Sequence, residues 1–226
     1  MMRYPTAWLQ GAALGEKIAC ELRLQIISGS ITPNTILSEN QIASEFGTSR
    51  NPVREALRTL SGEGLIRLER MGVVILGMTQ KDVEELYDIR LLIETFILER
   101  LSQMPCEPLL LTLKQTIDKM EMAAKHNNYE DFSYQDLYFH ETMIVEANHT
   151  RMLHLWNNIR YIVLTSLLVA TKRRFDTESH EIQPLIDKHK LIVSALVSKD
   201  LAHIKQVVHD HFKDTLQSVS KNVVKP

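Results

Sequence analysis

Two short helix signals separated by a single glycine constrain the fold of this chain more than any other feature. Ser38 opens the first segment, and Gln41 three residues later completes the pattern of a capping box. Gly47 ends that segment, and Ser49 begins the second, with Pro52 in its first turn, where a missing backbone N–H costs nothing. Two short helices joined by a glycine-containing turn predict a helix-turn-helix.

The segments on either side extend this prediction. Residues 14–28 carry apolar side chains at helical spacing and end at a glycine. After the helix-turn-helix, residues 65–69 alternate between apolar and polar side chains as in a strand. Residues 71–72 are expected to form a turn, and residues 73–76 the returning strand of a hairpin. A helix, a helix-turn-helix and a hairpin in this order predict a small winged helix-turn-helix.

The composition changes near Gly77, and from there the spacing of apolar residues is helical almost to the end of the chain. With 226 residues, the chain is long enough for two ordinary domains. We therefore expect a mainly α protein, with a winged helix-turn-helix over residues 1–77 and a six-helix domain over 78–226. The six helices are expected at about 79–102, 109–126, 129–147, 151–174, 179–198 and 200–219.

Composition indicates a soluble, cytoplasmic protein with no membrane association. No basic region followed by an apolar run marks a signal peptide, and the longest apolar stretch, 161–170, is about half a membrane span. Cys20 and Cys106 lie far apart and lack metal or redox spacing. The net charge of −2 gives no global signal for nucleic acid, although a small basic face can exist on an acidic protein.

The second helix of a helix-turn-helix places its first residues at the base edges of the major groove. Arg50 suits bidentate contact with guanine, Asn51 could read adenine or a phosphate, and Arg54 suits a phosphate. The hairpin would be the wing. The alternative is a small α/β module with a solvated arginine face. The candidate DNA-facing side chains are Ser49, Arg50, Asn51, Arg54 and Arg58, with Arg67, Arg70 and Gly72 in the wing.

The helical part contains a possible metal-binding pair. Asp136 and His140 are four residues apart, so both lie on one face of a helix and could bind one ion. This spacing is common, and the alternative is a surface pair without a ligand.

Two further histidines match this pair. His189 lies eleven residues before Asp200 and His211 eleven residues after it, so the two would be level in an antiparallel helix pair that turns there. His209 points to the opposite side of its helix. Together with the Asp136 pair, these residues form a nitrogen and oxygen donor set that suits Zn²⁺, Ni²⁺ or Mn²⁺ better than Mg²⁺. Chance pairing among nine histidines is the alternative.

The N-terminal part resembles the GntR family of bacterial repressors. The likeness rests on residues 37–43, 46–60 and 63–66, and most specifically on the run Ser-Arg-Asn-Pro-Val-Arg-Glu-Ala-Leu at 49–57. One departure is Asn34, where the family usually has glycine after proline; Asn tolerates the left-handed conformation, so the turn should survive. The resemblance implies DNA contacts by Asn40, Ser49, Arg50, Asn51, Arg54 and Gly72.

The C-terminal part resembles the FCD effector domain of the FadR-type subfamily. The landmarks are residues 86–90 with Glu94, Asp136 and His140, residues 187–189, and His211. The resemblance implies a divalent metal held by Asp136, His140, His189 and His211, and an effector whose carboxylate completes the coordination. Arg90 would clamp that carboxylate. Its alternative role is a structural salt bridge to Glu94.

Further matches cover most of the chain and are strongest before residue 102. They resemble family members that respond to sugar acids, which implies gluconate or a related acid as inducer. The implied function is a homodimeric repressor that leaves its operator when the acid binds, with no enzyme activity. A metal-dependent hydrolase and a pure metal-ion sensor are the alternatives. The basic run at 172–174 is expected to be a solvated helix end. The matching segments are 4–5, 8–9, 23–29, 35–40, 66–72 and 139–142.

Overall fold

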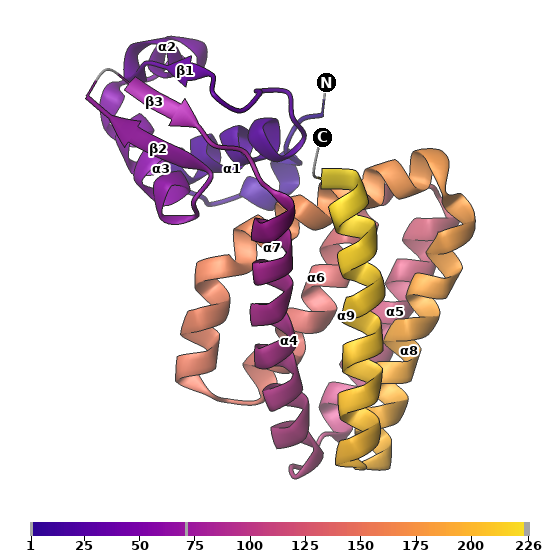
Figure 1. The fold of residues 1–226 in the computed structure, drawn as a ribbon. Coiled ribbons are helices and arrows are strands. Elements are labelled where there is room, and N and C mark those ends of the chain that lie inside the picture. Colours follow the sequence, from indigo (N-terminus) through magenta and orange to yellow (C-terminus); the bar gives the residue numbers. More distant parts are fainter. Residues whose placement is uncertain (1, 71, 224–226) are drawn as a thin grey trace. The chain divides into compact units, whose positions relative to one another are not determined.

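The computed structural model describes residues 2–70 and 72–223, with side chains up to residue 220. The chain forms two compact units, one ending at Gln80 and the other covering Lys81–Asn222 (Figure 1). Each unit is described by itself. Within the described residues, no helix combines the length and the apolar character needed to cross a membrane.

The first unit is the expected winged helix-turn-helix. Helix α1 packs against α3, and α2 also packs against α3. The three strands form an antiparallel sheet in the order β1-β3-β2, in which Leu37 pairs with Val73 and Ile66 with Ile75. Strand β1, only two residues long, was not predicted. The elements are a 3-10 turn at Thr6–Leu9, α1 (Leu14–Ile27), β1 (Ile36–Leu37), α2 (Glu39–Glu45), α3 (Arg50–Gly62), β2 (Ile66–Glu69) and β3 (Gly72–Ile75).

Local sequence signals account for these boundaries. The predicted capping box is confirmed, because the Gln41 backbone N–H donates to the Ser38 hydroxyl at 3.2 Å and the Ser38 N–H donates to the Gln41 side chain at 2.8 Å. Asn34 has a φ of +67°, so it adopts the left-handed conformation expected at this departure from the family pattern. Ser49 occupies the N-cap position of α3, but its side chain makes no capping bond.

A buried ion pair stabilises the packing of α1 on α3. Arg23 is 1% exposed, and its Nε and Nη2 donate to the two carboxylate oxygens of Glu63 at 2.7 and 2.6 Å. Glu63 directly follows α3, so this bidentate contact fixes the end of that helix against the middle of α1.

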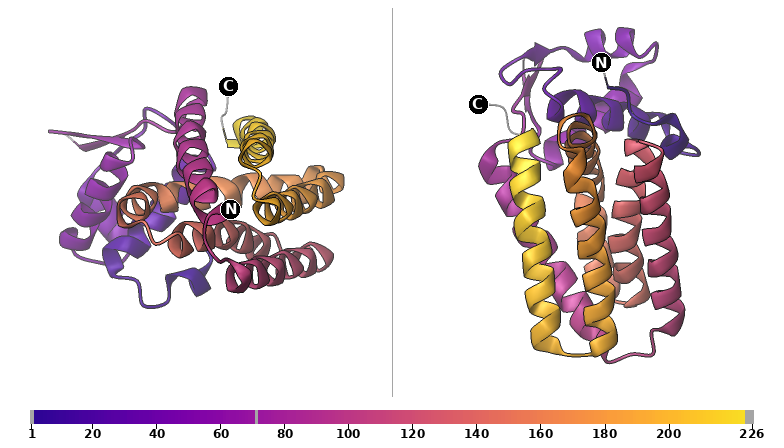
Figure 2. Two further views of the ribbon diagram at one scale, coloured as in Figure 1. Left: turned by 90° about the horizontal axis from the view of Figure 1, so that it is seen from below. Right: turned by 90° about the vertical axis from the view of Figure 1, so that its right-hand side faces the viewer.

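The second unit consists of six helices, as predicted, with ends that differ by a few residues (Figure 2). Helix α5 packs against α6 and α8, and α6 packs against α7. Helices α8 and α9 turn at Lys199, whose φ is +57°, and Asp200 caps α9 by accepting from the Ala202 N–H at 2.9 Å. The helices are α4 (Gln80–Ser102), α5 (Glu107–Lys125), α6 (Tyr129–Glu146), α7 (Thr150–Thr177), α8 (Ile182–Ser198) and α9 (Leu201–Val223).

Candidate metal centre and nucleic-acid interface

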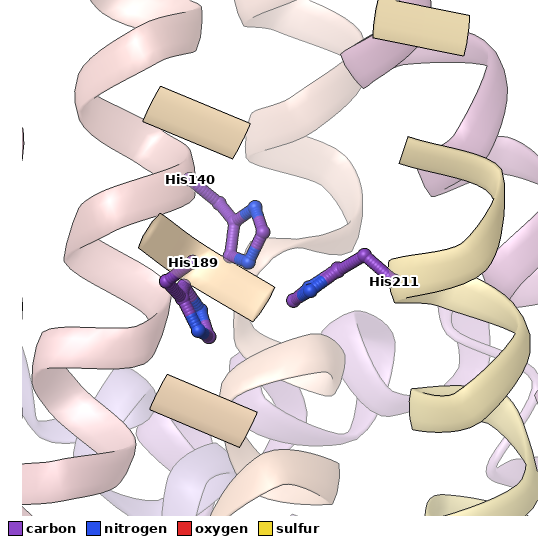
Figure 3. Close-up of side chains that lie close together, drawn as sticks. All are labelled: His140, His189 and His211. Atoms are coloured by element: carbon purple, nitrogen blue, oxygen red, sulfur yellow. The ribbon is translucent and has the colours of Figure 1, made fainter. Parts of the chain in front are cut away.

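Three histidines from three helices converge inside the second unit (Figure 3). His140 comes from α6, His189 from α8 and His211 from α9, and all three are at most 2% exposed. One ring nitrogen of each lies within 4.8 Å of the others. His189 and His211 are level, with ring centroids 4.9 Å apart, as their equal distance from the α8–α9 turn predicts. The rival His209 has a side chain 59% exposed.

Asp136 lies beside two of these histidines. Its Oδ1 is 3.6 Å from His140 Nε2 and 3.7 Å from His189 Nε2, and the residue is 3% exposed. Two ligands of one tetrahedral ion with bonds of about 2.1 Å are separated by about 3.4 Å. The structure therefore brings together the four residues that the spacing singled out.

The facing nitrogen atoms have no hydrogen-bond partner among the described residues. His140 Nε2, His189 Nε2 and His211 Nδ1 are buried and make no hydrogen bond within the described structure. Burying a polar atom without a partner is costly, and in native proteins such atoms usually have a reason. A divalent ion of the zinc, nickel or manganese type would satisfy all three, so the residues fit such an ion.

The opposite nitrogen atoms of two rings are held by hydrogen bonds. His140 Nδ1 bonds to Glu94 Oε2, and His189 Nδ1 bonds to the Leu185 carbonyl oxygen at 2.8 Å. Such bonds set the tautomer and ring orientation of a metal-ligating histidine, leaving Nε2 as the donor atom. From the sequence, Glu94 was expected to be a landmark of the FCD resemblance and a salt-bridge partner of Arg90, but not a partner of His140. Its contact with His140 spans 46 residues and leaves no signal in the sequence.

The protonation states in this cluster favour metal binding. Burial lowers the pKa of His140 and lowers that of His211 far below its usual value. Burial opposes ionisation of Asp136 and Glu94, but the pKa of each is lowered overall, by the adjacent imidazoles for Asp136 and by His140 and Arg90 for Glu94. Neutral imidazoles and ionised carboxylates are the forms that bind a cation.

Arg90 lies next to this cluster on α4 and is completely buried. Its Nε donates to Glu94 Oε1 at 3.2 Å, and its Nη2 lies 3.1 Å from the same oxygen, so the structural salt bridge exists. Neither Nη atom, however, makes a hydrogen bond of good geometry. The guanidinium also packs 4.7 Å from the Phe212 ring centroid. The salt bridge therefore still leaves donors for a carboxylate.

In the first unit, the predicted DNA-facing side chains of α2 and α3 are exposed. Arg50 Nε donates to Asn40 Oδ1 at 2.5 Å, so the second residue of α2 holds the first residue of α3. Arg54 Nε donates to Glu39 at 2.9 and 3.1 Å. The exposed set comprises Asn40, Ser49, Arg50, Asn51 and Arg54.

A hollow of about 370 Å³ separates these helix starts from the wing, and Asn40, Arg50, Arg70 and Gly72 line it. Gly72 has a structural reason to be glycine. Its φ is +151°, and a Cβ there would lie 2.7 Å from the Leu37 carbonyl oxygen. Pairing of β1 with β3 therefore requires a residue without a side chain.

Comparison with known families identifies both units. Residues 14–75 match the family model described as bacterial regulatory proteins of the gntR family, and residues 85–214 match the FCD domain. The chain belongs to the GntR family. The prediction from the sequence is confirmed for both the family and the fold class.

Several relatives of this GntR-family chain are similar along most of their length. A Bacillus subtilis protein is 42% identical over 216 residues, which cover 96% of this chain and 89% of the relative. A Bacillus licheniformis protein is 40% identical over 211 residues, which cover 93% of this chain and 87% of that relative. Both are named gluconate operon transcriptional repressor.

Solved structures share the fold at lower sequence identity. Escherichia coli McbR/YncC superimposes with a TM-score of 0.70 at 16% identity, covering 93% of this chain and 98% of that one. Listeria monocytogenes Lar superimposes with a TM-score of 0.66 at 18% identity, covering 92% of this chain and 97% of that one. These likenesses support the fold alone.

Proposed function

We propose that this GntR-family chain represses a gluconate utilisation operon and leaves its operator when a sugar acid binds in the FCD domain. The observation that carries the proposal is the buried cluster of Asp136, His140, His189 and His211, whose imidazoles have nitrogen atoms without a hydrogen bond and which Glu94 links to Arg90. We take gluconate as the acid because the two Bacillus relatives, 40% and 42% identical to this chain, are named gluconate operon transcriptional repressor.

On the DNA side, α3 would enter the major groove of each half-site, with Arg50 reading a base and Arg54 and Ser49 contacting phosphates. A pseudo-palindromic operator requires two copies of the chain. Helix α4 carries an exposed apolar stripe that suits such a contact: Ile89, Leu92 and Phe96 are 42%, 72% and 38% exposed. We propose that the repressor is a homodimer.

On the effector side, a bound divalent ion would supply a Lewis acid for the carboxylate and the neighbouring hydroxyl of the acid. The Arg90 guanidinium would pair with the same carboxylate through its Nη atoms, neither of which makes a hydrogen bond within the described structure, although Nη2 also lies 3.1 Å from Glu94 Oε1. Burial excludes water from these contacts and strengthens them. The acid releases the operator because it binds unequally to the DNA-bound and DNA-free arrangements of the protein.

The test is a fluorescence-anisotropy titration of the metal-loaded protein on a duplex from its own promoter region. We expect tight binding that weakens in millimolar gluconate. Tight binding indifferent to gluconate would keep the DNA-binding function and reject the effector. Binding no tighter than to a scrambled duplex would reject the repressor function as well.

A chelator separates this proposal from a pure metal-ion sensor, which remains the alternative. In an acid-responsive repressor, stripping the ion abolishes the response to gluconate and leaves operator binding in place. If chelation alone releases the operator and gluconate has no effect on the loaded protein, the ion itself is the signal.

A further inference from the structure

A hollow in the second unit lies outside the metal centre. It has a volume of about 590 Å³ and is bounded by the end of α7, the 3-10 turn at Ser179–Glu181, the first turns of α8, and α9. Its wall includes Arg174, Leu185, Lys188, Asp214 and Thr215. Nothing in the site described so far accounts for this cavity.

Two residues of the cavity wall lie one helical turn from candidate metal ligands. Leu185 is four residues before His189 on α8, and Thr215 is four residues after His211 on α9. Local hydrogen bonds confirm this relation, because the Leu185 carbonyl accepts from His189 Nδ1 and the Thr215 hydroxyl donates to the His211 carbonyl, each at 2.8 Å. Four residues correspond to about 6 Å along a helix, and they share one face.

Two buried donor atoms near the cavity and Arg90 have no hydrogen-bond partner among the described residues. Arg174 Nε is buried without a hydrogen-bond partner although its residue lines the cavity. The Tyr87 hydroxyl is also buried without a partner of hydrogen-bond geometry, and its ring centroid is 5.4 Å from Arg90 Cζ. Burial raises the pKa of Tyr87 to about 12, against the opposing charges of Arg90 and Arg174, so the phenol remains a neutral donor close to both.

The basic run at 172–174 is therefore not simply a solvated helix end. Lys172 follows the expectation more closely, since it pairs with Asp176 along the helix at 2.8 Å. Arg174, two residues later, is half-buried, lines the cavity and has a buried Nε without a hydrogen bond.

The charges on the cavity wall disfavour a second anionic group. Two cations, Arg174 and Lys188, face three acids, Glu178, Glu181 and Asp214. Lys188 is already paired with Asp214. A mixture of one available cation with several acceptors suits neutral hydroxyl groups, which both donate and accept hydrogen bonds.

We propose that this cavity is a distal subsite that binds the far hydroxyl groups of the sugar acid, with Arg174 determining its preferred length. The inference rests on the proposed function and adds a binding site for the end of the acid opposite its carboxylate. An extended six-carbon acid measures about 6 Å from first to last carbon, which matches the single turn between the two sites. In this arrangement an acid of this length would extend from the Arg90 clamp to Arg174, whereas a three-carbon hydroxy acid would contact Arg90 alone.

Isothermal titration of the metal-loaded protein with three acids tests this subsite. Glycerate shares the carboxylate and 2-hydroxyl of gluconate but is three carbons long, and glucarate replaces the terminal hydroxyl with a second carboxylate. We expect the wild type to bind gluconate at least about tenfold more tightly than glycerate, as one hydrogen bond to a charged group implies. Glucarate should bind more weakly than gluconate.

The variant Arg174→Met should lose this preference. Its gluconate affinity should fall about tenfold, toward that of glycerate, while its glycerate affinity stays within a factor of two. The matched control Arg173→Met removes the neighbouring cation, which does not line the cavity, and should bind all three acids as the wild type does. Unchanged glycerate binding also shows that the metal centre is intact.

Several results would overturn the inference. If the wild type binds gluconate and glycerate equally, or prefers glucarate, the distal subsite does not exist as proposed although the repressor function can stand. If Arg174→Met retains the preference for gluconate, Arg174 does not determine length. If no acid binds, the effector part of the proposed function fails together with the subsite.

Discussion

At the scale of single residues, Glu94 connects the two halves of the proposed effector site. One of its oxygens bonds to His140, a candidate metal ligand, and the other accepts from Arg90, the candidate carboxylate clamp. The side chain is 2% exposed, so water does not replace either contact. Glu94 is a positioning residue: it need not touch an ion or an acid, but it orients the groups that do.

The variant Glu94→Gln should weaken metal binding about 10- to 100-fold, the usual cost of losing an outer partner of a metal-ligating histidine. An amide oxygen is a weaker acceptor than a carboxylate, so His140 loses both orientation and basicity. Competition with a chelator measures the affinity for Zn²⁺ or Ni²⁺.

The matched control is Glu85→Gln on the same helix, where the side chain is 61% exposed and pairs with Lys81. It should bind metal as the wild type does. Equal affinity in the Glu94→Gln protein would show that His140 is held by packing alone. The thermal midpoint of the chelated variant separates a specific loss of ligand orientation from general destabilisation.

At the scale of elements, the wing depends on the pairing of β1 with β3, which the sequence pattern does not predict. Strand β1 has only two residues, too few for an alternating pattern, yet its pairing with β3 closes the sheet. Gly72 makes this pairing possible because its backbone passes so close to the Leu37 carbonyl. The sequence suggested Gly72 as a DNA contact, which stays a prediction, and the structure adds the steric reason.

The variant Gly72→Ala should detach β1 from β3 and destabilise the wing by roughly 1–3 kcal/mol, the typical cost of a strained backbone position. Without DNA present, hydrogen exchange of the amides in residues 34–38 and 72–76 should accelerate, and operator affinity should fall as a consequence.

Gly62→Ala is the control for this change. Gly62 is the last residue of α3, and a Cβ there meets no atom within 4 Å. Alanine at a helical position is favoured over glycine by up to about 1 kcal/mol, so exchange in the wing should stay the same. Normal exchange in Gly72→Ala, combined with weak operator binding, would instead assign Gly72 a direct role at the DNA.

Periodic patterns predicted much of the fold, and contacts between distant segments account for the rest. All six helices of the second unit were recognisable because each repeats its apolar residues and begins or ends at a recognisable residue. The four candidate ligands were recognisable because helical spacing and the α8–α9 turn fix their relative heights. The bond from Glu94 to His140 and the cavity beside Arg174 depend on how separate helices pack, which no local pattern encodes.

At the scale of the whole molecule, the proposed function requires communication between two compact units. Unit one carries the exposed arginines of α3, and unit two carries the buried ligand cluster, each with its own core. No side chain of the cluster belongs to the DNA-binding unit. The response must therefore be a coupling free energy between two separate binding events, and such coupling is reciprocal.

Reciprocity makes a prediction that does not depend on the route of communication. If gluconate weakens operator binding by a given factor, the operator must weaken gluconate binding by the same factor, typically 5- to 150-fold. Titrating gluconate into the metal-loaded protein, alone and saturated with operator duplex, measures that factor directly. A scrambled duplex of equal length at the same salt concentration should leave gluconate affinity closer to that of the free protein, because fewer specific contacts hold the DNA-bound arrangement. Identical gluconate affinity with and without operator would mean that the acid occupies its site without driving release.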